Sequence, residues 1–477
     1  MHYAPCGSCA GELRGKMRGD PRRLLGRPRR SRVHAVGLGH SRSYRWVVLA
    51  GAFFGVFGAV GLARFGYSAI LPSMQEDLGI TSAAAGSLAS WNLGGYTIMA
   101  AVGGLLTTRL GARKVATTGL LTTAMGMVLT GLACDLLTAS AARLITGLGN
   151  GMVLVPSLAL MAAWFETRQL GLASSFVSSG ASLALVLIGL TIPPIIASGG
   201  SDGWRLAWYF FAGATFCFAV LYGVFARNRP RPRERVALGD DPPPRSPRAE
   251  AGRISLGLKE VGRSGYAWHL GFIYLLYGFA FLIYVTFFQK RLGADLGYSG
   301  EYAGYLFLLV GLGGFVGAAP WGSVSDRIGR GRALALMFLI QAVAAALFAW
   351  VPTLPGVIVS AFILGLAAMG LPGVIGAGCG DQFGPALAST ALGLVTIFTG
   401  VGMVLGPYFA GMLADTLGSL AYSYTLASGV FLVAAVLAFR LREVGWVAAR
   451  TARQAANRSA EDEHVTLRTE NESSWEA

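Results

Sequence analysis

The sequence predicts an all-α membrane protein whose twelve transmembrane helices form two six-helix bundles. The chain has 477 residues, of which 54% are hydrophobic and only 13% are charged, whereas soluble proteins carry about 25% charged residues. Several apolar blocks exceed the roughly 18 uncharged residues that mark a membrane-spanning helix. Because backbone polar groups have no water partner in lipid, blocks of this length must be helices rather than barrel strands.

The apolar blocks divide the chain into two halves of six. They cover residues 46–74, 83–107, 115–134, 138–165, 170–197, 204–226, 266–289, 301–324, 332–351, 355–378, 386–413 and 417–440. The proline-rich, charged segment between the sixth and seventh blocks predicts a solvated linker. The expected organisation is a basic, disordered tail (1–43), a first bundle (44–227), a linker (228–265), a second bundle (266–440) and a tail (441–477). The first tail either binds anionic lipid or results from an upstream start codon.

The distribution of positive charge predicts the topology. If the N-terminus is cytosolic, 34 of the 39 lysine and arginine residues fall in cytosolic segments, which is the positive-inside pattern. We therefore expect a multi-pass protein in contact with the lipid bilayer, with both termini and the linker cytosolic. The net charge of +15 then reflects this topology and indicates no nucleic-acid partner.

Two loops of the chain repeat each other. "GLLTTRLGARK" (104–114) follows the second block and "GSVSDRIGRGR" (322–332) follows the eighth. Four positions match at a constant offset: Gly104, Arg109, Gly111 and Lys114 correspond to Gly322, Arg327, Gly329 and Arg332. Each half holds an even number of helices, so the halves are parallel repeats, an arrangement in which one bundle rocks against the other around a central site.

These motifs resemble those of a known family. The loop at 322–332 is similar to the signature loop of the major facilitator superfamily, and "RLITGLGNG" (143–151) resembles its fourth-helix motif. The segments "RFGYSAILPSM", "NLGGY" and "GFAFLIYVTFF" resemble the YbfB-like bacterial branch. The resemblance implies the major facilitator fold in a bacterial inner membrane.

The resemblance also implies a cytosolic latch between the bundles. In the first loop Thr108 stands where the family has an aspartate and Ala112 where it has an arginine, so only Asp326 keeps the acidic position. The gating or latch residues that the resemblance implies are Gly322, Asp326, Arg327, Gly329, Arg330, Arg332, Arg109 and Gly111.

Arg64 is the most informative residue of the first helix. It lies roughly 6 Å from the expected membrane midplane at 1.5 Å per residue. A charge at that depth costs at least about 2.5 kcal/mol, so it should face the bundle interior or a wet cavity. No block carries a carboxylate away from its ends. Arg64 is thus either a structural arginine bonded to neighbouring helices or a bidentate partner for a carboxylate ligand.

Other polar or aromatic side chains share faces of the predicted helices. Arg143 and Asn150 lie on one stripe of the fourth helix, and either a cavity role or an interhelical bond explains Arg143. The stripe of tyrosines and phenylalanines on the seventh helix is explained either by packing or by binding. The candidate substrate-binding residues are Arg64, Ser68, Asn92, Tyr96, Arg143, Asn150, Tyr277 and Tyr284.

The sequence predicts a transporter rather than an enzyme. It contains no phosphate-cradling loop, no catalytic set of residues and no pattern of metal ligands, so we expect no cofactor and no metal. The favoured hypothesis is a secondary transporter of a small organic anion of the carboxylate type, working by alternating access, with the proton as candidate coupling ion. The alternatives are an exporter of drugs or other small molecules of the same superfamily, and a non-transporting membrane sensor.

Overall fold

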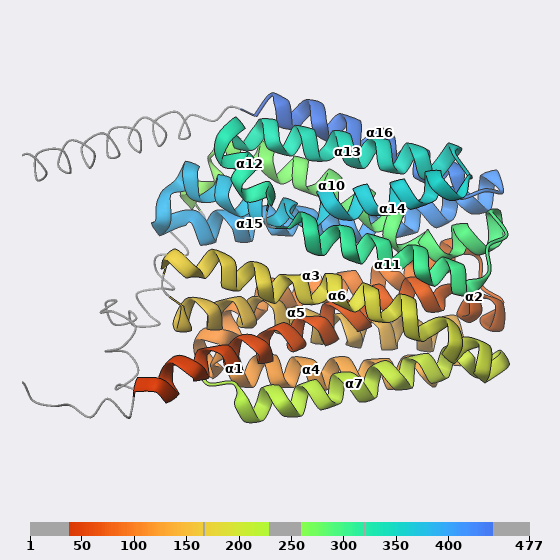
Figure 1. Ribbon diagram of the computed structural model, residues 1–477, viewed down its shortest axis with the longest axis horizontal. Helices are drawn as coiled ribbons and strands as arrows, with labels where there is room; N and C mark the ends of the chain where they lie inside the picture. The colour runs from red at the N-terminus through yellow and green to blue at the C-terminus, as the bar shows by residue number, and fades with distance from the viewer. Residues whose placement is uncertain (1–37, 166, 229–258, 319, 442–477) are drawn as a thin grey trace, which may run out of the picture.

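The protein is a bundle of helices that run side by side along its long axis. The computed structural model describes residues 38–165, 167–228, 259–318 and 320–441, and all regular elements of that part are helical (Figure 1). The described chain begins and stops at one end of the molecule, which we call the terminal end. The opposite end, where α2 stops and α3 begins, is the distal end.

The helices form two groups, one above the other in Figure 1. The first group contains α1 (Leu38–Val56), η2 (Phe57–Phe65), α2 (Gly66–Leu78), α3 (Ser82–Leu110), α4 (Ala112–Gly131), α5 (Leu136–Trp164), α6 (Thr167–Gly199), the 3-10 turn η3 (Gly200–Asp202) and α7 (Gly203–Phe225). The second contains α10 (Gly265–Lys290), η4 (Arg291–Asp295), α11 (Gly300–Gly317), α12 (Pro320–Ile328), α13 (Arg330–Trp350), α14 (Leu354–Ala368), α15 (Leu371–Leu417) and α16 (Ala421–Phe439).

The helices agree with the predicted spans. Among the described residues, nine segments are long and apolar enough to cross a membrane, and one of them, Leu172–Phe225, contains most of α6 and all of α7. α3 and α4 are long enough but less apolar, because glycine and threonine dilute their hydrophobic residues. α15 contains parts of two spans, since the φ of +70° at Gly384 interrupts the helix. The prediction of an all-helical membrane protein is confirmed.

The first membrane helix is irregular at its centre. α1 passes into a nine-residue π-helical segment, η2, before α2 continues to the distal end. A π-helical segment is rare and occurs frequently at functional sites, because it re-aims the side chains that it carries. Arg64 belongs to η2, and the sequence pattern gave no sign of this irregularity.

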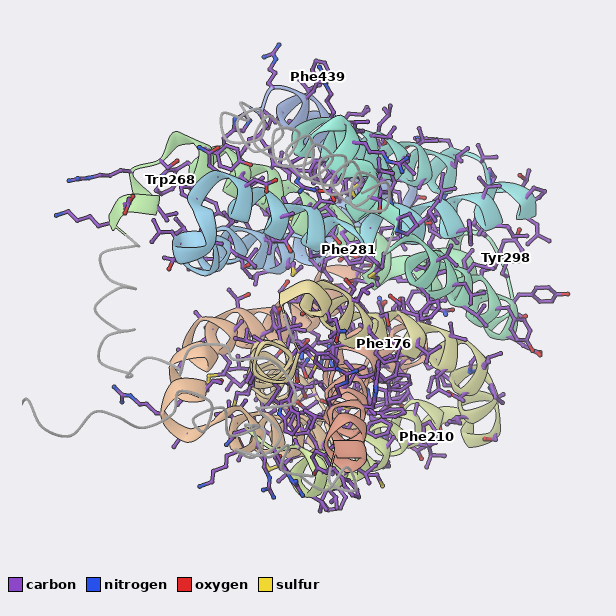
Figure 2. All side chains as sticks on the ribbon, turned by 60° about the vertical axis from the view of Figure 1, so that its left-hand side comes forward. Phe176, Phe210, Trp268, Phe281, Tyr298 and Phe439 are labelled. Atoms are coloured by element: carbon purple, nitrogen blue, oxygen red, sulfur yellow. The ribbon has the colours of Figure 1, made fainter. Side chains whose placement is uncertain are left out.

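Small residues bring the two groups into contact from the middle of the molecule to the distal end. α3 packs on α15, α6 on α11 and α2 on α10. A Cβ at Gly86 would overlap the carbonyl oxygen of Pro407, and one at Gly189 would overlap that of Gly304, so the backbones approach as they do at small-residue interfaces in membranes. Figure 2 shows Phe281 of α10 at this boundary, where its ring meets Phe65 edge to face at 6.4 Å.

The predicted tails and linker fall almost wholly outside the described residues. The structure describes residues 38–43 of the first tail, residue 228 and residues 259–265 of the linker, and residue 441 of the second tail. The expected disorder and lipid binding of these segments remain predictions.

The close approach of α11 and α14 generates a stability prediction. A Cβ at Gly365 would overlap the carbonyl oxygen of Val310, whereas one at Gly429 would meet nothing within 4 Å. Gly365→Ala should therefore destabilise the protein by about 1–3 kcal/mol through overpacking. Gly429→Ala is the control and should be neutral or stabilising by up to about 1 kcal/mol, because alanine is the better helix former. Thermal unfolding in detergent measures both, and equal midpoints would refute the packing assignment.

Candidate functional site

Arg64 projects from η2 toward the second group of helices. Its Nη2 donates to the Met403 sulfur at 2.8 Å, and this sulfur is its one hydrogen-bond acceptor among the described residues. Its guanidinium carbon lies 5.2 Å from the ring centre of Tyr96 and 5.6 Å from that of Phe65. The buried Nε has no hydrogen-bond partner in the described part of the chain. Arg64 is thus held by polarisable groups and not by a carboxylate.

Arg143 of α5 supports the backbone on which Arg64 sits. Its Nη1 donates to the carbonyl oxygen of Ala63 at 2.9 Å, and its guanidinium lies over the rings of Tyr67 and Trp208 at 4.7 and 5.1 Å. The side chain is 1% exposed. Cation–π contacts and a hydrogen bond to backbone compensate a buried guanidinium in part. Arg143 therefore positions the residue before Arg64 and contributes a second positive charge to the same region.

Glycines let the surrounding helices come close to these arginines. A Cβ at Gly61, one turn before Arg64, would overlap the Cβ of Ala184 on α6. A Cβ at Gly147, one turn after Arg143, would overlap the carbonyl oxygen of Asn92 on α3. The amide of Asn92 in turn donates to the carbonyl oxygen of Arg143 at 3.2 Å. The spacing of glycine and polar residues thus fixes where η2, α3 and α5 meet.

A small cavity lies between the two arginines. Its volume of about 10 Å³ is room for about one water molecule. The lining residues are Arg64, Phe65, Tyr67, Ser68, Ala89, Asn92, Leu93 and Arg143 from the first group, and Leu282, Val285 and Thr286 from α10. Four of them carry buried polar atoms without a partner among the described residues: Arg64 Nε, Arg143 Nε, Ser68 Oγ and Asn92 Oδ1.

The unpaired atoms around this cavity favour an anion. Buried polar atoms are almost always hydrogen-bonded, so an unpaired cluster requires an explanation, such as a ligand or water. Two of the four are guanidinium donors and one is a hydroxyl that can donate. The surroundings therefore offer donors and positive charge to any occupant.

The distal end is closed by contacts that cross between the groups. The Asp415 carboxylate, near the end of α15, accepts from the backbone N–H groups of Ser82 and Ala83 at 2.9 and 2.7 Å. These are the first residues of α3, whose N–H groups have no partner within the helix and which carry the positive end of its dipole. Lys290 Nζ donates to Ser82 Oγ at 2.6 Å. Hydrogen bonds between described residues of the two groups occur at the distal end and near Arg64.

The signature loop forms its ion pairs within the second group. Arg330 pairs with Asp326 at 2.6 Å and with Asp381 of α15 at 2.9 Å, and donates to Ser325 Oγ at 2.5 Å. Arg330 is buried, whereas Asp326 has a half-exposed side chain. In this conformation the ion pairs of Arg330 hold α12, α13 and α15 together.

The two loop glycines that repeat at an offset of 218 adopt the same kind of backbone conformation. Gly111 and Gly329 each precede a helix with φ of +85° and +97°, a region that side-chain-bearing residues rarely adopt. The remaining latch residues, Gly322, Arg327, Arg332 and Arg109, are exposed at the terminal end.

The sequence matches one protein family across most of its length. Residues 53–293 and 270–469 each match the Major Facilitator Superfamily. The chain belongs to that superfamily. It is a transporter of the multi-pass membrane type and not an enzyme, and the two-bundle architecture is the major facilitator fold.

Solved structures of superfamily members confirm the fold. A bacterial homologue of the human lysosomal transporter Spinster, in an inward-facing and unoccupied conformation, superposes with a TM-score of 0.60 at 17% identity, covering 86% of this chain and 97% of the homologue. A D-xylose–proton symporter superposes with a TM-score of 0.64 at 18% identity, covering 86% and 99%.

Sequence relatives carry the names of several anion transporters. SauU of Cupriavidus necator, a probable sulfoacetate transporter, is 24% identical over 275 residues, which cover 56% of this chain and 61% of the relative's length. Human monocarboxylate transporter 11 is 27% identical over 418 residues, covering 81% and 80%. The gallate transporter of Pseudomonas putida is 27% identical over 432 residues, covering 78% and 91%.

The structure brings five of the predicted site residues together. Arg64, Ser68, Asn92 and Arg143 line the cavity, and Tyr96 lies against the Arg64 guanidinium. Tyr277 lies on the same face of α10 as Phe281, with stacked rings 5.3 Å apart, and its hydroxyl donates to the Ala368 carbonyl.

Two predicted residues lie elsewhere, inside one group each. Asn150 accepts from Thr123 between α4 and α5, and Tyr284 bonds Ser360 while it packs on Phe348 and Tyr424. The aromatic stripe on α10 therefore has two parts. Its distal part, around Tyr284, packs within the second group, whereas Tyr277 and Phe281 lie nearer the boundary with the first group.

Sequence reasoning missed the partners that come from the second group. Met403 and Thr286 are unremarkable in an apolar block, and only the approach of α15 and α10 to η2 reveals them. Arg291, the first residue of η4, is buried and pairs with Asp295 at 2.6 Å.

The distal contacts predict a shift in conformation. Asp415→Ala should remove the bonds to α3 and destabilise the closed distal end by about 1 kcal/mol, or roughly fivefold. Spin labels at Leu137 and Leu354, both exposed at the distal end, in a background without the five native cysteines, should report a larger population of long distances. Asp202→Ala is the control, because among the described residues this aspartate pairs with Arg205 of its own group and with no residue of the other. An unchanged distribution would show that Asp415 does not hold the distal end.

The Arg330 cluster predicts different effects for its two acids. Asp381→Asn should lower the unfolding temperature, because its less exposed carboxylate leaves a buried guanidinium with one fewer charged partner. Asp326→Asn should leave insertion and the unfolding temperature near those of the wild type but reduce transport in proteoliposomes. Normal transport by Asp326→Asn would make the signature loop a purely structural element.

Proposed function

We propose that this chain is a secondary active transporter that moves a small organic anion of the carboxylate type by alternating access. One observation carries the proposal. Arg64 lies at membrane depth beside a cavity between the two groups, and no described carboxylate neutralises it. A guanidinium binds a carboxylate through two parallel hydrogen bonds, and the unpaired Nε and neighbouring donors supply what such a ligand requires.

The relatives support the same substrate class. The names of several relatives refer to sulfoacetate, monocarboxylates, gallate and gentisate, all of which carry an acidic group. We also place the chain in the YbfB-like branch on the segments around Arg64, Asn92 and Phe281.

The positive-inside distribution supports a bacterial inner-membrane location with cytoplasmic termini. The terminal end is then cytoplasmic, and the contacts between α3 and α15 at the distal end join the two groups on the outer side. The predicted spans hold no carboxylate away from their ends that could carry a proton. In this proposal the coupled proton is therefore bound by the carboxylate of the substrate and not by a protein side chain.

A binding titration tests the anion proposal. Purified wild type should be stabilised against heating by gallate or sulfoacetate in proportion to ligand excess over the dissociation constant, and methyl gallate, which lacks the carboxylate, should have little effect. Arg64→Lys should weaken anion binding at least about tenfold, because an ammonium keeps the charge but loses the bidentate geometry.

The matched control is Arg263→Lys, an exposed arginine outside the membrane helices, which should bind like the wild type. Equal affinities of the wild type and Arg64→Lys would make Arg64 a structural residue and remove the main support for the proposal. Preferential stabilisation by amines or sugars would favour another transporter class.

A further inference from the structure

The contact between Arg64 and Met403 joins the two groups of helices at the site itself. A thioether is a weak hydrogen-bond acceptor, and this sulfur is the group that Nη2 of Arg64 contacts. Nε and Nη2 point along the same edge of the guanidinium plane, the edge that a carboxylate engages with both oxygens. Met403 therefore contacts Nη2, one of the two nitrogens of this edge, while the other, Nε, is unpaired among the described residues.

The packing of α15 on α10 fixes the position of Met403. A Cβ at Gly402 would overlap the carbonyl oxygen of Leu275, and one at Gly406 would overlap that of Phe279, so the two backbones touch on both sides of Met403. A Cβ at Gly278 would lie 3.1 Å from Met403 Cγ. The side chain is 9% exposed and is confined between α10 and Arg64.

We propose that Met403 is a placeholder for the anionic oxygen of the substrate. Its sulfur holds Nη2 while the carrier is empty, and a carboxylate displaces it by accepting from both Nε and Nη2. This inference rests on the proposed function and adds a residue that sets the affinity. A flexible, unbranched thioether suits the role, because it can change rotamer without repacking its helix.

The exchange connects binding to the contact between the groups. In the empty carrier the Arg64–Met403 bond links η2 to α15, and binding replaces it with a bond to the ligand. A neutral ligand is too weak an acceptor to compete along both N–H directions, so it leaves the link in place. Met403 therefore has two effects: it holds the Arg64 side chain in place, and it favours the binding of charged over neutral ligands.

Three substitutions of Met403 test the placeholder by gallate titration. Met403→Leu keeps the volume but removes the acceptor, and gallate should bind several-fold more tightly. Met403→Gln supplies a stronger neutral acceptor and should weaken binding by about tenfold. Met403→Glu supplies an internal carboxylate and should abolish measurable binding. Met412→Leu, on the exposed face of the same helix, is the control and should bind like the wild type.

A measurement without ligand tests the contact itself. Met403→Glu should raise the unfolding temperature in the wild-type background, because it forms an ion pair with Arg64, and lower it in an Arg64→Leu background, where its charge is buried alone. The same sign in both backgrounds would overturn the contact. Wild-type affinity in both Met403→Leu and Met403→Gln, with binding lost in Arg64→Lys, would overturn the placeholder and leave the anion function standing. Absence of any anion binding by the wild type would overturn both.

Discussion

A guanidinium at membrane depth without a carboxylate partner is the constraint on which the site depends. The cost of such a charge is several kcal/mol unless polar or polarisable groups surround it. Around Arg64 the protein supplies a thioether and two aromatic rings, each of which stabilises a cation without neutralising it. The arginine is thereby tolerated in the empty carrier and keeps its full charge for a ligand.

The second arginine serves a different purpose in the same region. Arg143 donates one hydrogen bond to the backbone of η2, and its guanidinium lies over two aromatic rings. It therefore positions η2 and also lines the cavity. The two explanations that the sequence left open for Arg143 are therefore compatible, because its Nη1 makes an interhelical bond while its Nε remains unpaired beside the cavity. Its bond to the Ala63 carbonyl also satisfies a backbone acceptor within the π-helical segment η2.

Much of the fold was predictable from the sequence, because apolar length, glycine spacing and charge distribution are local or statistical properties of the chain. The repeat at Gly111 and Gly329 was visible because both positions need the same backbone conformation. The residues that line the cavity were predictable only where one helix carries the signal, as at Arg64 and Asn92. Met403 and Asp415 were not predictable, since their partners lie more than 300 residues away on the opposite group. Tyr284 was predicted to bind substrate but packs inside the second group. The spacing of an aromatic stripe does not reveal which part of it faces a neighbouring helix.

The contacts of α15 with the first group follow one stripe of that helix. Three are close approaches: Gly400 to Thr97, Pro407 to Gly86 and Gly411 to Ser82. The other three are hydrogen bonds: Met403 accepts from Arg64, the carbonyl of Val404 accepts from Ser90, and Asp415 accepts from the first N–H groups of α3. Side chains three and four residues apart lie on one face of a helix, so a rigid tilt of α15 loosens all of these contacts together. The weakest acceptor in the stripe, the Met403 sulfur, is the contact that a ligand can replace. Under the proposed function, a ligand bound at Arg64 would act on the same helix face that contacts α3 at the distal end. This is a physical route by which occupancy of the site would alter the balance between closed and open states.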